Sequence, residues 1–351
     1  MAIKSIYKWH HWTGLLAGLF LLLMSITGSL LVFTDEMEHA ADQPLKEFSN
    51  PSGSYSYDSS FALIKQKFPG YEVRLYDQPG KNEALVYDLR GRSDNKKVFV
   101  NPTKPEIIKT IDGDTQLHRK LLLFHYTFFA GTTGKIFVVV IGVLFLLSVI
   151  TGFIIFRKAI WKTIRFKTVS RYRGKAAFYS SLHRNIGVWT LLFNLLIIAS
   201  GLALSIAIAK NAIKTSGSKP STSHQVDFSL DSIVERVTRS NPEFEIHLVR
   251  IPAYGNTVRI SGRYKNDLAV YGDYASYFLI NGLSKKTEKK QVMSDLPLTE
   301  KLLLMAAPLH FGNYGGIFLK IIYCFFGIMP AILSITGFLI WRKRRRIKEC
   351  N

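Results

Sequence analysis

The stretch HHWTG at residues 10–14, which runs on to Thr27-Gly28, is matched by HRNIG at residues 183–187, which runs on to Ser200-Gly201. The match has no gap, because the histidines, the glycines after them and the Ser/Thr-Gly dipeptides all lie 173 positions apart. Both stretches lead into a long apolar run. Self-similarity at a fixed spacing indicates an internal duplication, so we expect two halves that are built alike.

A second match links the later parts of the two halves. His125 corresponds to His310, and Thr151-Gly152 corresponds to Thr336-Gly337, each at an offset of 185 positions. An ionisable residue beside an apolar membrane segment is energetically expensive and usually serves a function. The four matching histidines therefore form two candidate pairs, His10 with His183 and His125 with His310.

Net charge and hydropathy together restrict the class of protein. The chain of 351 residues carries a formal net charge of +21, and 48% of its residues are hydrophobic. The basic residues lie at the ends of apolar runs, which disfavours both a nucleic-acid binder and an ordinary soluble enzyme. Each run is close to the roughly 20 residues that a membrane-crossing helix needs. We expect four such helices, at residues 14–33, 136–156, 188–209 and 317–341.

Basic residues also predict the orientation of these helices. Lys4 and Lys8 precede the first run, a basic segment separates the second from the third, and Arg342 follows the fourth. Such segments stay in the cytoplasm, so both termini are expected inside. The first run is longer than a signal-peptide core, and we expect it to remain as a helix. The expected order is a cytoplasmic N-terminus with the first helix (1–34), an exported domain (35–117), the approach to the second helix with that helix (118–157), a basic cytoplasmic loop (158–184), the third helix (185–210), a second exported domain (211–308), the fourth helix (309–342) and a basic tail (343–351).

The two exported segments repeat one pattern of elements. Each begins with a short amphipathic helix and continues with alternating apolar and polar runs that are typical of strands. We therefore expect two small α+β domains. The helices are predicted at 61–68 and about 229–239, and the strands at 71–76, 84–89, 97–100, 244–251, 257–264 and 276–280.

Paired histidines beside apolar helices fit the ligands of haem. A six-coordinate b-type haem takes one neutral imidazole on each face, and its porphyrin needs an apolar slot, which neighbouring membrane helices provide. The two cysteines, Cys324 and Cys350, form no C-x-x-C-H attachment motif, so any haem would be held without a covalent bond. A continuous helix from His125 to Arg157 would span roughly 48 Å, which places the His125 pair near the outer membrane interface.

Several strings carry a resemblance to a known family. They are WHHWTGLLAGLF from residue 9, FHYTFFAGTTGKIF from 124, SVITGFIIFRK from 148, LHFGNYGGIFLK from 309 and LSITGFLIWRK from 333. These strings and their order resemble the PepSY-associated transmembrane family, and the resemblance covers nearly the whole chain. The chain is similar to members that are inner-membrane ferric-siderophore reductases with two b-type haems. This implies that the exported domains are PepSY-like and face the periplasm.

The resemblance also implies roles for particular residues. The haem iron would be bound by His10, His183, His125 and His310. The usual Leu-His-Arg signature is kept at His183-Arg184, whereas the first half reads Trp9-His10-His11, so His10 and His11 both stay candidates. His118, seven residues before His125, is a candidate substrate contact, alternative ligand or neighbour of a haem propionate. Arg184 is a candidate propionate partner or lipid anchor.

The predicted fold is a mainly α membrane protein with four transmembrane helices in two tandem repeats. Each repeat consists of a helix, a periplasmic α+β PepSY-like domain and a second helix, and both termini lie inside. The function implied for this bacterial inner-membrane protein is reduction of a periplasmic ferric siderophore, or other ferric chelate, for iron acquisition. Electrons would come from membrane quinol or a separate donor; the expected partners include lipid but no nucleic acid.

Two other functions fit the same sequence. One is a non-enzymatic, membrane-anchored PepSY sensor or peptidase inhibitor. The other is a transporter whose histidines bind a metal ion or protons. Haem content separates the reductase from the sensor, and metal-dependent uptake without a visible spectrum would favour the transporter.

Overall fold

The computed structural model describes residues 3–46, 56–76, 83–104, 106–167, 174–215 and 228–349. The chain divides into two compact units. Met1–Phe33, Leu121–Gly217 and Ala306–Asn351 form the first, which we call the helical unit, and Thr34–Lys120 and Ser218–Met305 form the second, the sheet unit. Part of the predicted basic loop, residues 168–173, and residues 216–227 lie outside the described residues.

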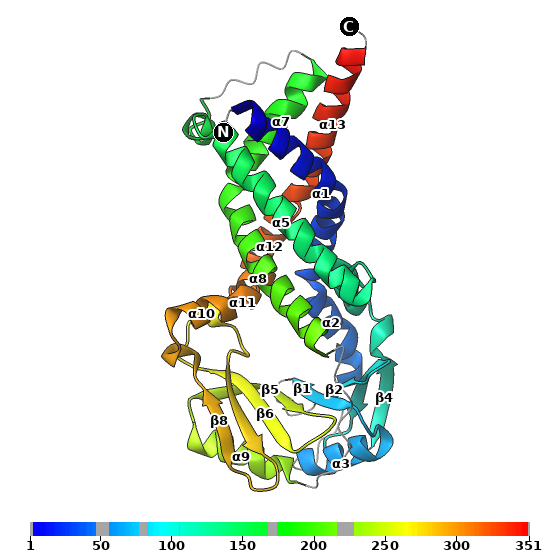
Figure 1. Ribbon diagram of the computed structural model, residues 1–351. Helices are drawn as coiled ribbons and strands as arrows, with labels where there is room; N and C mark the ends of the chain where they lie inside the picture. Colours follow the sequence, from blue (N-terminus) through cyan, green and yellow to red (C-terminus); the bar gives the residue numbers. More distant parts are fainter. Residues whose placement is uncertain are drawn as a thin grey trace. The chain divides into compact units, whose positions relative to one another are not determined.

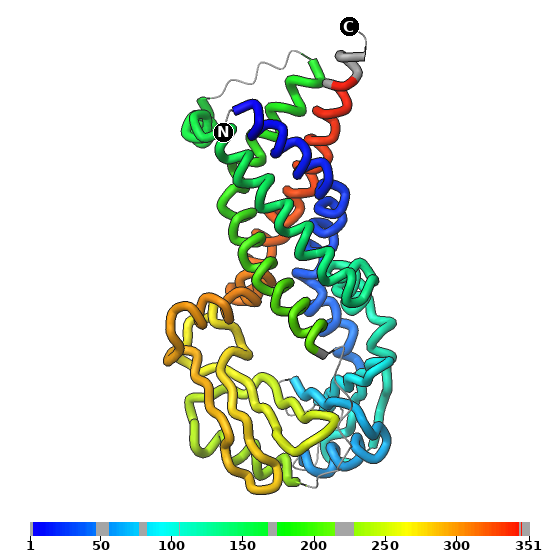
Figure 2. Tube along the Cα trace, viewed as in Figure 1, coloured from blue at the N-terminus to red at the C-terminus, as the bar shows by residue number. Residues whose placement is uncertain are grey.

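The helical unit contains the predicted membrane helices. Among the described residues, four helices are long and apolar enough to cross a membrane: Ile3–Leu31, Gly131–Phe156, Leu191–Lys214 and Gly316–Lys343. This confirms the four predicted spans, which Figures 1 and 2 show running lengthwise through the unit. The unit consists of α1 (Ile3–Leu31), the end of α4 (Leu117–Thr127), α5 (Gly131–Phe156), α6 (Ile160–Ile164), α7 (Lys175–Trp189), α8 (Leu191–Thr215), α11 (Ala306–Phe311), α12 (Gly316–Gly327) and α13 (Met329–Glu349).

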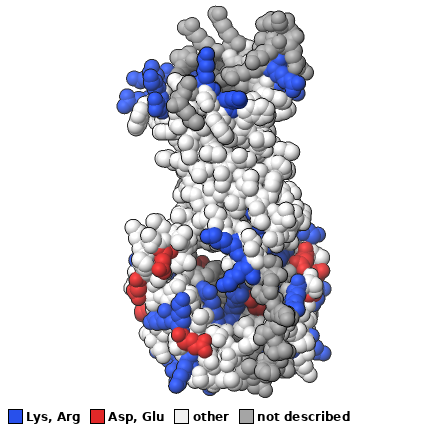
Figure 3. Space-filling view, in the orientation of Figure 1, with Lys and Arg blue, Asp and Glu red and all other residues white. Residues whose placement is uncertain are grey.

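The surface of these helices is apolar. Large hydrophobic side chains stand exposed along them, for example Leu192 with 81% and Phe318 with 73% of their surface accessible. In a soluble protein a continuous apolar surface of this kind would be a liability, but lipid covers it in a membrane. On the face that Figure 3 shows, the middle of the unit is free of charged side chains and basic residues gather at one end. Both chain termini lie at that end (Figure 1).

The structure corrects one detail of the helices. A continuous helix from His125 to Arg157 was expected, but α4 ends at Thr127 and α5 begins at Gly131. Between them Phe128 and Phe129 adopt positive φ angles of 48° and 59°, a backbone conformation that costs a bulky residue energy. The chain therefore turns sharply just after His125, and the prediction of one helix here is wrong.

The sheet unit is a single antiparallel sheet with the order β4-β3-β2-β1-β5-β6-β7-β8. All six predicted strands are confirmed, with small shifts at their ends. The two edge strands were not predicted, because their exposed residues lack a buried face and hence an apolar alternation. The strands are β1 (Glu72–Tyr76), β2 (Leu85–Arg90), β3 (Asn95–Val100), β4 (Ile107–Asp112), β5 (Phe244–Ile251), β6 (Thr257–Tyr264), β7 (Ser276–Asn281) and β8 (Thr287–Gln291), and the helices are α2 (Thr34–Lys46), α3 (Tyr57–Lys67), α9 (Leu230–Ser240), α10 (Leu298–Leu304) and the start of α4.

The two expected α+β domains are joined into this one sheet. Strand β1 of the first segment pairs antiparallel with β5 of the second, with Val73 opposite Ile251 and Leu75 opposite Val249. These side chains belong to one hydrophobic core with residues of both α3 and α9. A small domain buries a low fraction of its apolar surface when it folds alone. Pairing the two edge strands gives both segments a common core.

Helices α3 and α9 also cap each other. The Asp231 carboxylate accepts hydrogen bonds from the Tyr57 and Asp58 backbone N–H groups, at 2.9 and 3.2 Å. In return, the Asp58 carboxylate accepts from the backbone N–H groups of Leu230 and Asp231. A carboxylate at a helix N-terminus satisfies free N–H donors and complements the helix dipole. Asp58 and Asp231 are 173 positions apart, the same offset as His10 and His183.

Candidate functional site

The histidines of each predicted pair lie next to one another in the helical unit. His10 of α1 and His183 of α7 have ring centroids 6.2 Å apart, with the ring planes at 76°. His125 of α4 and His310 of α11 have centroids 6.3 Å apart, with the planes at 50°. The structure thus brings together the two members of each predicted pair, although the four histidines come from segments that are distant in sequence.

Each ring docks through Nδ1 on the hydroxyl of a serine or threonine from a different helix. All four of these residues belong to the Ser/Thr-Gly dipeptides that lie at matching offsets in the sequence. The distances from Nδ1 to the hydroxyl oxygen are 3.2 Å for His10 and Thr151, 3.1 Å for His125 and Thr27, 2.9 Å for His183 and Thr336, and 3.2 Å for His310 and Ser200.

The same hydroxyls decide which ring nitrogen carries the proton. Each hydroxyl also lies near the backbone carbonyl four residues earlier in its own helix, at 2.6 to 2.9 Å, and this carbonyl is the nearer partner in all four cases. A hydroxyl has one hydrogen to donate. With that hydrogen given to the carbonyl, the hydroxyl oxygen accepts from the histidine. We therefore assign Nδ1–H as the donor, which leaves the lone pair on Nε2, the nitrogen free to bind a metal.

The glycine after each hydroxyl residue makes room for the imidazole. A β-carbon at Gly28 would lie 2.9 Å from Cε1 of His125, and one at Gly201 would lie 2.8 Å from Cε1 of His310. The corresponding distances are 3.1 Å from Gly152 to His10 and 3.5 Å from Gly337 to His183. Any side chain at Gly28 or Gly201 would displace the ring. The Ser/Thr-Gly dipeptide is therefore a cradle in which the hydroxyl orients the histidine and the glycine admits it.

A cavity of about 1020 Å³ adjoins the His10/His183 pair. This volume is at the upper end of the roughly 300–1,000 Å³ that is typical of cofactor and ligand sites. Its lining is mostly apolar and includes His10, His11, His183 and Arg184. Nε of Arg184 is buried and has no hydrogen-bond partner among the described residues. A buried donor without a partner costs about 1–3 kcal/mol, so this nitrogen indicates a group that the protein alone does not supply.

The comparison with known families agrees with this architecture. The profile of the PepSY-associated TM region matches residues 7–344. The chain belongs to this family. The match spans both units and all four histidines, so the predicted membership of this family is confirmed. A search of curated proteins found no match.

Within this PepSY-associated chain, His10 rather than His11 lies opposite His183. The His11 ring contacts the indole of Trp12, with centroids 5.6 Å apart, and His11 lines the same cavity. Only His10 has its Nδ1 on the Thr151 hydroxyl and the Ser148 carbonyl, the latter at 2.9 Å. The geometry of the cradle therefore favours His10 as the partner of His183, and His11 as a wall of the cavity.

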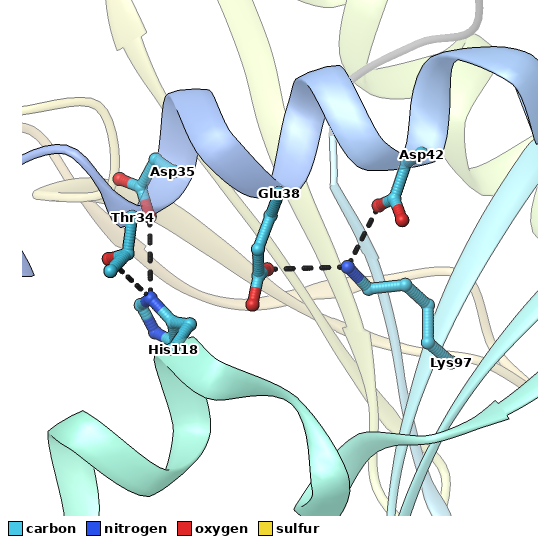
Figure 4. A network of polar contacts seen from close by, with 6 residues as sticks. All are labelled: Thr34, Asp35, Glu38, Asp42, Lys97 and His118. Atoms are coloured by element: carbon cyan, nitrogen blue, oxygen red, sulfur yellow. Dashed lines mark hydrogen bonds and ion pairs between the residues drawn. The ribbon is translucent and has the colours of Figure 1, made fainter.

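His118 belongs to the sheet unit, where it joins a polar cluster with α2 and β3 (Figure 4). Its Nδ1 lies 2.7 Å from the Thr34 hydroxyl and 3.9 Å from the Asp35 carboxylate. It lies seven positions before His125 in α4, but its contacts are those of a residue that ties α4 to α2. These contacts favour a structural role for His118 over a role as a ligand.

Sequence reasoning did not find the centre of this cluster, Lys97. Its ammonium group is 2.9 Å from the Asp42 carboxylate and 3.3 Å from that of Glu38, and only 7% of the residue is exposed. Burial alone would lower the pKa of Lys97, but the hydrogen bond to Asp42 and the charges of the nearby carboxylates raise it overall. The available signal was Lys97 itself, a charge in a strand whose next three residues are Val98, Phe99 and Val100.

Proposed function

We propose that the His10/His183 and His125/His310 pairs would each hold the iron of one b-type haem, and that the helical unit conducts electrons across the membrane. The single observation that carries this proposal is the geometry of the pairs. An iron bound by two imidazole nitrogens at about 2 Å each separates the ring centroids by about 6 Å. The separations of 6.2 and 6.3 Å match this spacing, and in each pair Nε2 is the nitrogen left free.

Other features of this chain support haem at these positions. The apolar cavity beside His10 and His183 suits a porphyrin, and the unpartnered Nε of Arg184 suits a propionate. The hydroxyl partners hold each imidazole in the tautomer that presents Nε2, as is usual around metal-binding histidines. When bound, a b-type haem supplies reversible one-electron transfer at its iron. The chain supplies the ligands, their orientation and a dry slot.

The contacts also support a tandem duplication. In the first half, His10 docks on the second membrane helix while His125 docks on the first. In the second half, His183 and His310 repeat this reciprocal arrangement. The reciprocal caps Asp58 and Asp231 extend the correspondence into the sheet unit. We infer two tandem repeats, each with one membrane helix before its part of the sheet and one after it.

The separation of the two pairs supports an electron route. His10 and Gly28 lie on one helix, and 18 residues at 1.5 Å each separate them by about 27 Å. Because His125 rests against Gly28, the two pairs lie near opposite ends of the membrane-spanning part, which is about 30 Å thick. The basic residues at the end of the unit that holds both termini favour a cytoplasmic location for that end. This orientation puts the sheet unit in the periplasm of a bacterium and the His125/His310 pair on the periplasmic side.

The proposed reaction is one-electron reduction of a ferric chelate to its ferrous form. Electrons from membrane quinol or a separate donor would enter at the His10/His183 side and leave at the His125/His310 side. Ferric iron prefers hard oxygen ligands, and the softer ferrous ion binds them less tightly. Reduction of a ferric siderophore in the periplasm therefore releases its iron, which makes the chain a ferric-siderophore reductase for iron acquisition.

The absorption spectrum of the purified full chain tests the haem. In detergent, protein from a haem-sufficient host is expected to carry close to two haems per chain, with the spectrum of six-coordinate low-spin iron. Acid-acetone should extract them, because the chain has no cysteine attachment motif. Colourless protein would overturn the proposal and leave the sensor and transporter hypotheses.

Oriented vesicles test the direction of transfer. A ferric chelate that cannot cross the membrane should oxidise the dithionite-reduced protein when it is added on the side of the sheet unit. The His310→Ala protein should react much more slowly, whereas His39→Ala, an exposed residue of α2, should react like the unmodified protein. Reoxidation only from the opposite side would reverse the proposed route.

A further inference from the structure

One face of the sheet carries a row of arginines that the electron route does not use. Residues Arg74 of β1, Arg250 of β5 and Arg259 of β6 lie directly opposite one another on three adjacent strands. Like charges in opposing positions of neighbouring strands destabilise a sheet. Such a row is therefore costly unless something else compensates the charge.

The row lies on the face opposite α3 and α9. The alternate residues of the same strands, among them Val73, Val249 and Ile260, belong to the core that those helices cover. Because side chains alternate between the faces of a strand, the arginines project from the other face.

The carboxylates of the sheet compensate this charge only in part. Glu72 is the shared partner of Arg74 and Arg250, at 2.7 and 2.6 Å. Burial alone would raise the pKa of Glu72, but the two arginines lower it overall, so the carboxylate stays ionised. Asp88 continues the row opposite Arg74, but burial raises the pKa of this carboxyl group, which weakens its contribution.

Arg259 is the residue with the least compensation. Its Nε donates to the Ser261 hydroxyl at 3.0 Å, and its guanidinium carbon lies 3.9 Å from the ring centroid of Tyr277. It has no carboxylate partner among the described residues. Burial, together with the nearby charge of Arg250, lowers the pKa of Arg259. The guanidinium group of Arg259 is therefore partly desolvated and stacked on an aromatic ring, and its N–H donors other than Nε–H can bind a ligand.

Aromatic rings border the arginine row. Tyr277 lies under Arg259, and the ammonium of Lys289 is 5.8 Å from the same ring. Tyr76 of β1 contacts Tyr274, which is 43% exposed. Guanidinium groups bind paired anionic oxygens with two parallel hydrogen bonds and also stack on flat rings. The face thus combines positive charge, paired donors and aromatic surfaces.

We infer that the sheet face around Arg74, Arg250 and Arg259 binds the chelate in an anionic, aromatic form, as a ferric complex of catecholate groups. Such a complex carries net negative charge, adjacent oxygens and aromatic rings, which match the guanidinium groups and tyrosines of this face. A ferric complex of hydroxamate groups has no net negative charge and lacks the rings. The inference rests on the proposed function, because it names the class of chelate that the reductase receives.

Binding of a gallium complex tests the inference without electron transfer. Gallium(III) tris-catecholate has the shape and charge of the ferric complex but is not reduced, so titration calorimetry on the full chain in detergent measures binding alone. Arg259→Gln should weaken this binding about tenfold, and Arg259→Lys should weaken it less. Among the described residues Arg259 forms no ion pair, so the substitution removes none there.

The matched control is Arg239→Gln, an exposed arginine of α9 that pairs with Glu235. Arg239→Gln should leave the affinity for the catecholate complex unchanged. Arg259→Gln should not change the affinity for a neutral gallium hydroxamate complex. Equal affinity of the Arg259→Gln and unmodified proteins would overturn the site, as would inorganic phosphate binding as tightly as the catecholate complex. Haem content is measured separately. If the protein contains haem but fails this titration, the proposed site is wrong and the proposed electron route stands. If the protein is colourless but passes the titration, the site stands and the electron route is wrong.

Discussion

The two histidine pairs have the same contacts but are carried by different kinds of backbone. His10 and His183 lie within α1 and α7, helices of 29 and 15 residues. His125 and His310 lie on α4 and α11, helices of 11 and 6 residues that end in turns with left-handed residues, including Phe128 and Gly312. The first pair is positioned by long helices. The second depends on short helices, strained turns and the close approach of two glycines. Histidines that match in sequence therefore have matching supports, and the difference in backbone lies between the two pairs.

Removal of one ligand from each pair gives the largest expected effect. His183→Ala and His310→Ala should each lose, or convert to high spin, a different haem, because the two residues belong to different pairs. Haem content per chain and low-temperature spectra of the reduced protein measure this. Loss of the same spectral component in both variants would show that the pairs are wrongly assigned.

Adjacent histidines allow a sharper test of the first pair. His10→Ala should abolish the same component as His183→Ala, whereas His11→Ala should keep both haems, because only His10 contacts the Thr151 cradle. The opposite outcome would make His11 the ligand.

Substitution of the glycines should cause more loss of haem at the His125/His310 pair than at the His10/His183 pair. Gly201→Ala and Gly28→Ala place a methyl group 2.8 and 2.9 Å from a histidine carbon, closer than such contacts allow, whereas Gly337→Ala leaves 3.5 Å. The first two variants should therefore lose most of the haem between His125 and His310. Gly337→Ala should keep its haem with a small shift of the spectrum. Haem stoichiometry compares the variants, and equal losses in all three would contradict the cradle.

The hydroxyl groups should have a smaller effect than the glycines. Thr27→Val removes the acceptor of the His125 Nδ1–H group and keeps the shape of the side chain. Loss of such a partner typically lowers metal affinity by about 10- to 100-fold, so haem should dissociate faster from the His125/His310 pair. Thr27→Ser keeps the hydroxyl and should behave like the unmodified protein. Dissociation to apomyoglobin measures the rates, and equal rates in the two variants would remove the proposed role of the hydroxyl.

Sequence reasoning predicted the parts of the molecule whose pattern repeats. The spacing of 173 between His10 and His183 and of 185 between His125 and His310 identified two pairs, and the structure places the members of each pair side by side. The sequence marks Gly28 and Gly201 as matching positions but does not indicate that they make room for a ring. Their contact with His125 and His310 depends on how the helices cross, which no pattern within one helix reveals.

Features that depend on pairing between distant segments could not be predicted. Each segment of the sheet unit contains its own helix and strands, so nothing in either segment indicated that β1 would pair with β5. The arginine row is a consequence of that pairing. Arg74 and Arg250 become neighbours only when the register of the two strands is known, because a shift by one residue would turn one of them to the other face.

Substitution of Arg184 should have the smallest effect of these changes, a shift in the midpoint potential of one haem only. Its position corresponds to His11 at the offset of 173, and both residues line the cavity beside His10 and His183. A positive charge near haem favours the reduced iron, which carries one positive charge less. Arg184→Gln should therefore lower the midpoint potential of the haem at this pair and leave that of the other haem unchanged, whereas Arg239→Gln, in the sheet unit, should change neither potential. Spectroelectrochemical titration resolves the two components, and a shift confined to the His125/His310 component would place the propionate partner elsewhere.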